Sequence, residues 1–338
     1  MKQGRLLLLA LLLLAVSLVS LCLGKFNLGL GETVSFLART ALGLPGTDPA
    51  RQELLDNVLL QIRLPRVLAA LLIGASLSTV GTALQAVFTN PLVSPKTTGM
   101  LAGASFGTVL GVLIADQWVV CQAFALVFGF AAVGLAMLIS KMSRSESILM
   151  LVLGGIASDA LFMSLSMTGQ YLADPYTKLP VIVHWLMGNL ALVQRSTALL
   201  AAIPMVIGTG VLCLCGRQLN ALSMGEDEAR SLGVSVRFVR LGVLLISTLL
   251  TSLTVLLGGG SMVGWVGLIV PHGARMLLGP NNVSLLPASA LIGAIYLIVM
   301  DDISRLTFSF ELPIGVITSL VGIPFFIYVI KDARKGWA

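Results

Sequence analysis

Long apolar stretches separated by short polar segments dominate the pattern of this sequence. Each stretch holds about 20 residues, the length that a helix needs to cross the hydrocarbon core of a bilayer. A membrane barrel is excluded, because its strands would alternate apolar and polar positions. The pattern predicts an all-α, polytopic membrane protein of about ten transmembrane helices, with residues 1–338 forming one domain. The predicted spans are 6–24, 64–84, 97–114, 118–140, 148–167, 192–214, 238–257, 262–278, 284–300 and 312–330.

The composition supports this prediction. Hydrophobic residues make up 57% of the 338 residues and charged residues 11%, whereas a soluble domain carries roughly 25% charged residues. The net charge of +6 does not indicate nucleic-acid binding, because the basic residues are dispersed among loops. The four cysteines lie in or beside apolar runs without a C-x-x-C pair, which predicts buried free thiols. We expect no metal or cofactor site in this chain.

The basic residues predict the orientation of the spans. Ten spans place both termini on one side, and a cytoplasmic placement puts 13 of the 21 basic residues in inside loops. The apolar run from Leu6 to Leu23 is longer than the core of a secretory signal, so we expect it to remain as the first span. The inside basic residues are Lys2, Arg5, Lys96, Lys141, Arg144, Arg217, Arg230, Arg237, Arg240, Arg275, Lys331, Arg334 and Lys335.

Small residues repeat every four positions in two of the spans. Such ridges let helix backbones approach closely in lipid, so they predict tight helix packing. The loop 25–62 contains GETVSFLARTALG, which is amphipathic and predicts an interfacial helix. The ridges are Gly74, Ser78 and Thr82 in the second span, and Gly99, Gly103, Gly107 and Gly111 in the third.

One charged segment, LNALSMGEDEARSLGVSVRF from Leu219 to Phe238, lies between two apolar stretches on the predicted cytoplasmic side. Ser223 and Glu226 have the spacing of a capping box, and Gly233 is placed to end a helix. The segment predicts a helix of about ten residues, which is too short to be stable alone in water. It must therefore dock, either in a groove of another protein or on its own bundle. Four residues share one face of this helix: Leu222, Gly225, Ala229 and Leu232.

The chain lacks the chemistry that would drive transport. No G-x-x-x-x-G-K-[ST] loop for a nucleotide is present, and GGGS at Gly258–Ser261 lacks the lysine. Asp159 is the only acidic residue well inside a predicted span, so no proton relay is visible; it either faces a path or hydrogen-bonds within the bundle. The sequence shows no inverted repeat of a secondary transporter and no nucleophile–base pair of an intramembrane enzyme. The pattern indicates a transport subunit whose motor is another protein.

Several long motifs resemble those of the permease subunits of bacterial ABC importers for iron chelates, haem and cobalamin (the FecCD type). The first starts at Arg63 and holds R-x-P-R, G-x-x-L and Q-x-x-x-x-N-P-L-x-x-P in that order. GWVGLIVPHGAR from Gly264 is similar to the family's F-V-G-L-x-x-P-H-x-x-R motif, with Trp265 where Phe is more usual. ELPIGVITSLVGIPFFIYVI from Glu311 resembles the family's closing helix, and residues 219–236 lie where the family has its cytoplasmic coupling helices.

The resemblance implies the type II ABC importer permease fold and a non-catalytic subunit in a bacterial or archaeal inner membrane. It implies a homodimer with its path on the twofold axis, two cytoplasmic ATPase subunits that bind ATP and Mg²⁺, and an extracytoplasmic substrate-binding protein. The substrate crosses by alternating access. We expect an iron chelate (siderophore or haem), with molybdate, tungstate and cobalamin as alternatives. The residues implied in ATPase coupling are Leu222, Ser223, Gly225, Glu226, Ala229, Leu232 and Gly233.

Further residues are candidates for docking, for the path or for its gate. In the family, arginines at the motif positions of Arg63, Arg66 and Arg305 hold acidic residues of the binding protein. The alternative is pairing within the chain, because Arg305 is near three acids in sequence, Asp301, Asp302 and Glu311. Gln85 and Asn90 lie at the end of the second span, where they line the path or hold the Asn-Pro turn. The family's inner gate corresponds to the loop with Ser143, Ser145 and Ser147, and His184 and His272 are expected to be structural.

Overall fold

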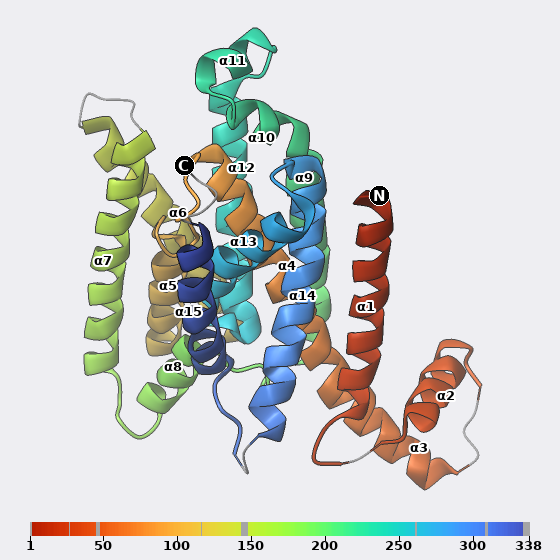
Figure 1. Cartoon of the computed structure of the whole chain (residues 1–338). Helices are drawn as coiled ribbons and strands as arrows, with labels where there is room; N and C mark the ends of the chain where they lie inside the picture. Colours follow the sequence, from red (N-terminus) through yellow and green to blue (C-terminus); the bar gives the residue numbers. More distant parts are fainter. Residues whose placement is uncertain are drawn as a thin grey trace.

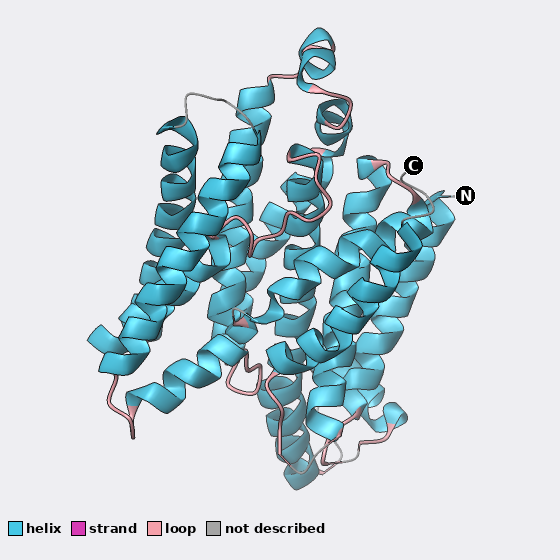
Figure 2. Cartoon of the chain, turned by 60° about the vertical axis from the view of Figure 1, so that its left-hand side comes forward, coloured by secondary structure: helices cyan, strands magenta, loops and turns pink. Residues whose placement is uncertain are grey.

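The structure, a computed structural model, describes residues 2–26, 28–44, 48–115, 117–142, 148–260, 262–307 and 310–333. Within these ranges the chain forms helices joined by short loops and turns, and no strand occurs (Figure 2). The all-α prediction is therefore confirmed.

Each predicted span coincides with a helix. These helices are α1 (Lys2–Cys22), α4 (Leu64–Val87), α5 (Met100–Ile114), α6 (Trp118–Met142), α7 (Ile148–Leu172), α9 (Arg195–Leu214), α12 (Val236–Thr254), α13 (Val266–Leu278), α14 (Asn282–Leu306) and α15 (Ile314–Ala333). Shorter helices lie between them: α2 (Leu30–Ala41), α3 (Pro49–Leu55), α8 (Lys178–Met187), α10 (Gly216–Leu222) and α11 (Glu226–Ser231). Asp56–Arg63 and Val255–Gly259 are π-helical, and Met262–Trp265 is a 3₁₀ turn.

Length and composition support membrane crossing for most of these helices. Within the described ranges, seven helical stretches are long and apolar enough to span a bilayer. Three predicted spans correspond to shorter apolar helices, Met100–Ile114, Val263–Leu278 and Ile314–Ile327. A multi-pass membrane architecture follows, and the number of ten crossings stays a prediction.

The bundle has two distinct ends. α10 and α11 project beyond one end, and α2 and α3 lie at the other, beside the ends of α1 and α4 (Figure 1). We name them the α11 end and the α3 end. The helix predicted in GETVSFLARTALG is confirmed as α2, whose Phe36 packs with Leu55 and Leu59.

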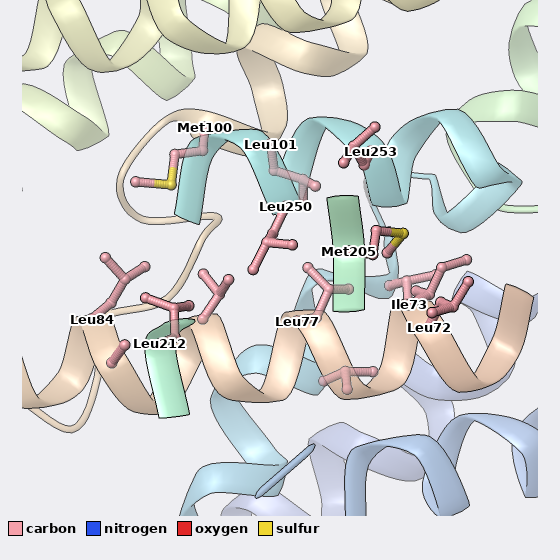
Figure 3. Close-up of a cluster of buried hydrophobic side chains, with 14 of the residues drawn as sticks. Leu72, Ile73, Leu77, Leu84, Met100, Leu101, Met205, Leu212, Leu250 and Leu253 are labelled. Carbon is pink, nitrogen blue, oxygen red and sulfur yellow. The ribbon is translucent and has the colours of Figure 1, made fainter. Parts of the chain in front are cut away.

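α4 occupies the centre of the bundle. Apart from Arg66 and Gln85, its residues are apolar or small on every side, which is typical of a helix that is buried all round. Figure 3 shows Ile73 and Leu77 of α4 close to Met205 of α9 and Leu250 of α12, and all four side chains are buried. α13 and α14 pack against α4 as well. The helix is thereby held by van der Waals contacts over its whole length, which is the main stabilising term between helices in lipid.

Small residues set the distances between the central helices. A Cβ atom at Gly74 would collide with the backbone of Gly293 in α14, and one at Gly81 would collide with the backbone of Gly267 in α13. The same close approach joins α5 to α6 at Gly103, Gly107 and Gly111. The tight packing predicted from the small-residue ridges is confirmed.

α7 and α15 lie at the edge of the bundle. α7 packs on α5 and α6, and α15 packs on α13, α14 and the 3₁₀ turn. Both helices carry large apolar side chains that no described part of the chain covers. These include Leu153, Ile156, Leu161, Met163, Met167, Leu320 and Val321. Lipid or a second protein must cover them in a membrane.

Candidate functional site

The charged segment folds into two short helices rather than one. α10 ends at Leu222, and α11 begins only at Glu226 after a turn. Gly225 takes φ +128 in this turn, a conformation that other residues rarely adopt. Ser223 donates a hydrogen bond to the carbonyl of Leu219 at 2.8 Å, so it closes α10 and does not cap α11. The predictions of a capping box and of one helix of about ten residues were wrong, because the chain turns between the two capping-box residues.

The end of this segment agrees with the sequence. Gly233 has φ +78, and its N–H donates to the carbonyl of Arg230 at 3.0 Å, while the next N–H donates to the carbonyl of Ala229 at 2.9 Å. This pair of bonds is the Schellman arrangement that ends many helices. Glu226 accepts a hydrogen bond from Arg240 of α12 at 2.5 Å, so an ion pair fastens α11 to the bundle.

The fold divides the face that was predicted to be continuous. Leu222 and Ala229 are buried within the chain, whereas Leu232 is 63% exposed. The prediction of one shared face is corrected, because the helix breaks at Gly225. The exposed apolar surface at the α11 end instead comprises Met224, Leu232 and Phe238, which we call the α11 patch. Met224 and Phe238 were missed from the sequence, although large apolar residues in a charged segment were a usable signal.

Two of the three candidate docking arginines hold α1 against the bundle near the α3 end. Arg63 donates to three backbone carbonyls, two in the last turn of α1, including that of Leu21 at 2.7 Å, and one just after the helix. Arg305 donates to the carbonyl of Ser20 at 2.7 Å and forms an ion pair with Asp302. Both arginines are buried. These contacts tie the end of α1 to α4 and α14.

Arg66 connects α4, α14 and the segment before α15. Its guanidinium pairs with Asp301 at 2.9 Å and with Glu311 at 2.9 Å, and only 8% of the Arg66 side chain is exposed. Glu311 keeps 38% of its side chain exposed. Arg66 and Arg305 thus pair with acids of the chain, as in the within-chain alternative, whereas Arg63 bonds to backbone carbonyls. Docking of a binding protein stays a prediction for all three.

The remaining path candidates have structural contacts. Gln85 is buried, and its side-chain oxygen accepts a hydrogen bond from Arg275 of α13 at 3.1 Å. Asn90 accepts from the N–H of Leu92 at 2.9 Å, as expected for an Asn-Pro turn. Gln85 therefore joins α4 to α13. The gate candidates Ser143, Ser145 and Ser147 lie outside the described residues.

The two histidines show no metal site. Among the described residues, no group of three or more His, Cys, Asp or Glu side chains could hold a metal ion. His184 lines a small cavity of about 110 Å³ without Asp, Glu, Lys or Arg in its described lining, and a smaller one of about 20 Å³ that Arg66, Asp301 and Glu311 also line. His272 lies within α13.

A larger cavity of about 450 Å³ lies among α5, α7, α15 and the 3₁₀ turn. Its lining includes Asp159 of α7, so this acid faces a cavity and not the helix packing. Lys96, which the sequence placed with the inside loops, lines the same cavity, and its ammonium nitrogen lies 5.8 Å from the centre of the Trp265 ring. This grouping was missed, because it joins three segments that are far apart in the sequence. Ser105, Ser166, Gln170 and Ser319 complete the polar lining.

Known proteins share this architecture over nearly the whole chain. A solved structure described as an inward-facing conformation of a putative metal-chelate type ABC transporter matches with TM-score 0.85 and 36% identity, covering 98% of this chain and 99% of the other. A *Haemophilus influenzae* molybdate import system permease protein, MolB, is 36% identical over 97% of this chain and 95% of its own length. The *Yersinia pestis* hemin transport system permease protein HmuU is also 36% identical, over 95% of each chain. The sequence profile of the FecCD transport family matches residues 11–332, and the chain therefore belongs to that family.

Proposed function

We propose that this chain is the permease subunit of an ATP-driven importer that moves an iron chelate from a binding protein into the cytoplasm by alternating access. The observation that carries the proposal is the projection of α10 and α11 beyond the bundle (Figure 1), together with the exposed side chains of the α11 patch. A cytoplasmic ATPase that receives this patch would supply the energy, because the chain has no nucleotide-binding loop. ATP and Mg²⁺ would bind to that ATPase, and this chain would carry out no covalent chemistry.

The orientation follows from this assignment. The α11 end faces the cytoplasm, with both termini on that side, and the α3 end faces outward to the binding protein. Arg63, Arg66 and Arg305 lie near the outward end, where their contacts hold α1, α4 and α14 together. We assign them to shaping the surface that the binding protein meets, with Glu311 as the exposed member of the network.

A second copy of the chain would complete the path. The uncovered apolar faces of α7 and α15 flank the large cavity, so a copy related by a twofold axis would cover both faces and enclose the cavity between the subunits. Two permease subunits would then present two α11 patches to two ATPase subunits. This arrangement supports a homodimer with its path on the axis.

The names of the relatives give different substrates. The *Helicobacter pylori* relative, named a probable iron chelatin transport permease, is 35% identical over 83% of this chain. It supports an iron chelate, as does the hemin permease at 36%. Molybdate is the second candidate, because the molybdate permease is also 36% identical, over 97% of this chain and 95% of its own length.

Reconstitution tests the proposal. The chain is co-expressed with the ATPase and binding protein encoded beside it, purified, and inserted into liposomes containing ATP. We expect an ATPase to co-purify and ⁵⁵Fe-labelled chelate or ⁹⁹Mo-labelled molybdate to accumulate only with ATP. Accumulation that persists in vesicles prepared without the ATPase would remove the proposal.

A further inference from the structure

The large cavity is lined by one positive and one negative side chain, Lys96 and Asp159. Asp159 is the twelfth residue of the 25-residue helix α7, so at about 1.5 Å per residue it lies near the midpoint of the helix. Lys96 is close enough for its charge to act on Asp159. Neither residue belongs to an ion pair among the described side chains. Charged groups at this depth are costly unless they have a function or a partner.

The backbone that carries Lys96 is fixed against α7. Gly155 of α7 lies so close to this segment that a Cβ there would contact the carbonyl oxygen of Thr97 at 2.6 Å and the Cα of Thr98 at 2.9 Å. The N–H of Ser94 donates to the hydroxyl of Thr97 at 2.9 Å, which closes the turn that contains Lys96. The position of the lysine is thus set by the fold.

Trp265 orients the lysine side chain. The ammonium group lies over the face of the indole ring at 5.8 Å from its centre, a distance at which the ring attracts a cation. The contact occupies one side of the ammonium group, and the residue remains exposed to the cavity. Asp159 is less accessible, because it is half-buried. The cavity therefore presents its positive charge more openly than its negative charge.

Ser105 adds an unsatisfied polar group to the same cavity. Its side chain is 3% exposed, and its hydroxyl has no hydrogen-bond partner in the described part of the chain. The hydroxyls of two other lining residues are already bonded, Ser166 to Phe162 and Ser319 to Gly315. Four buried hydroxyls in the described part of the chain lack a partner, and Ser105 is the one among them that lines this cavity. An acceptor in the cavity would satisfy it.

We infer that the cavity is a transit site for an anionic cargo whose oxygen atoms accept from the Lys96 ammonium group and the Ser105 hydroxyl. Asp159 is then the counter-charge that compensates Lys96 when the cavity is empty and favours release of the anion. The shared chemistry is an anionic oxygen group, as in a free oxyanion or in a metal chelate with unliganded carboxylates. This inference rests on the proposed function and narrows its substrate to anions.

The experiment uses the complete permease–ATPase complex with its binding protein in liposomes. Two anionic probes are used, molybdate as a free oxyanion and ferric citrate as a chelate, so that the two kinds of cargo are distinguished. Ferrichrome is the neutral probe. Binding of ⁹⁹Mo-labelled molybdate and ⁵⁵Fe-labelled citrate to the detergent-solubilised complex is measured by equilibrium dialysis, so that transit binding is seen without the binding protein. The variants are Lys96→Met, Lys96→Arg, Ser105→Ala and Asp159→Asn, with Lys141→Met at the exposed end of α6 as the control.

We expect Lys96→Met to lower both the binding and the uptake of one anion at least tenfold. ATP hydrolysis by the complex should be unchanged, and so should any uptake of ferrichrome. Lys96→Arg restores most of the uptake, Ser105→Ala lowers it a few-fold, and Lys141→Met has no effect. Equal loss for charged and neutral probes, or no loss for anions, overturns the inference, as does an assembled wild-type complex that binds neither anion. Loss of uptake in Asp159→Asn alone would indicate a cationic cargo and would also overturn it. Failure of the ATPase to co-purify is a different result, which removes the proposed function itself.

Discussion

α4 and α7 are both long apolar helices, yet they have opposite environments in the fold. In the helical stretch Pro49–Val87, which contains α4, 83% of the residues in an apolar 18-residue window are buried. In the corresponding window of α7, only 28% are buried. Apolar character therefore does not tell a central helix from a peripheral one, because lipid is as apolar as a protein core. Small residues that meet a neighbouring backbone, such as Gly74 and Gly81, identify α4 as central. In α7, Gly154 and Gly169 lie on the side that packs on α5 and α6, and many large apolar residues are left for lipid or a second subunit.

The largest effect should come from adding volume to α4. Gly81→Leu places a side chain into the backbone of Gly267 in α13, and overpacking of this kind should destabilise the protein by about 3 kcal/mol or more. Gly134→Leu in α6 is the matched control, since a Cβ there meets no atom within 4 Å. Thermal unfolding in detergent measures both. Equal stability of the two variants would contradict the central position of α4.

The second effect concerns the α3 end of α4. Arg66→Ala leaves Asp301, which is 1% exposed, without its main partner, and loss of one member of a buried ion pair should cost about 3–5 kcal/mol. Arg230→Ala in α11 is the control, because its side chain is 61% exposed and should change stability by less than about 1 kcal/mol. If unfolding measurements gave Arg66→Ala the small effect of the control, Arg66 would not be a structural residue.

The third prediction tests what covers α7. Ala157 is exposed on this helix, and in a homodimer that closes over α7 and α15 it faces the second copy. Ala157→Cys should give a disulfide-linked dimer on mild oxidation in membranes, seen on a non-reducing gel. Leu12→Cys on the exposed side of α1 is the control and should stay monomeric on the gel. Cross-linking of α1 but not of α7 would place the dimer interface elsewhere.

The smallest effect lies just after α7. Hydrogen bonds from the hydroxyl and N–H of Thr177 and from the N–H of Tyr176 lower the pKa of Asp174. A carboxyl group whose pKa is lower in the folded state stabilises the fold above its unfolded pKa, near 3.9, and this contribution is lost as the pH falls through the folded pKa. The melting temperature of Asp174→Ala should therefore lie slightly below that of the wild type at pH 6 and approach it below about pH 3. A difference that stays constant with pH would contradict this role.

The sequence predicted the parts of the fold that depend on local patterns. The apolar stretches located the helices, Gly233 ended α11, and the Asn90 turn formed as expected. The break at Gly225 was missed, because the acids after it also suit the first turn of a longer helix. The resemblance to the family gave the overall architecture, which hydropathy alone would not have ordered in space.

The candidate sites were less predictable, because they depend on contacts between distant segments. Arg66 finds Asp301 and Glu311 only when α4, α14 and the start of α15 meet. Lys96, Asp159 and Trp265 come from three separate segments, and nothing in their spacing indicates a common cavity. Lys96 lies in the loop between α4 and α5, as the sequence predicted, but hydropathy does not indicate that a residue of this loop lines a cavity with Asp159.

Coupling through the α11 patch is the central claim, and uptake by the Leu232→Glu variant tests it most directly. Leu232 is exposed at the α11 end, so the substitution should leave folding and dimer formation intact. ATP hydrolysis and uptake of labelled substrate are measured in the same liposomes, with Leu42→Glu near the opposite end as the matched exposed control. The account predicts at least a tenfold fall in substrate molecules taken up per ATP hydrolysed for Leu232→Glu and no change for the control. An unchanged ratio in Leu232→Glu would contradict it.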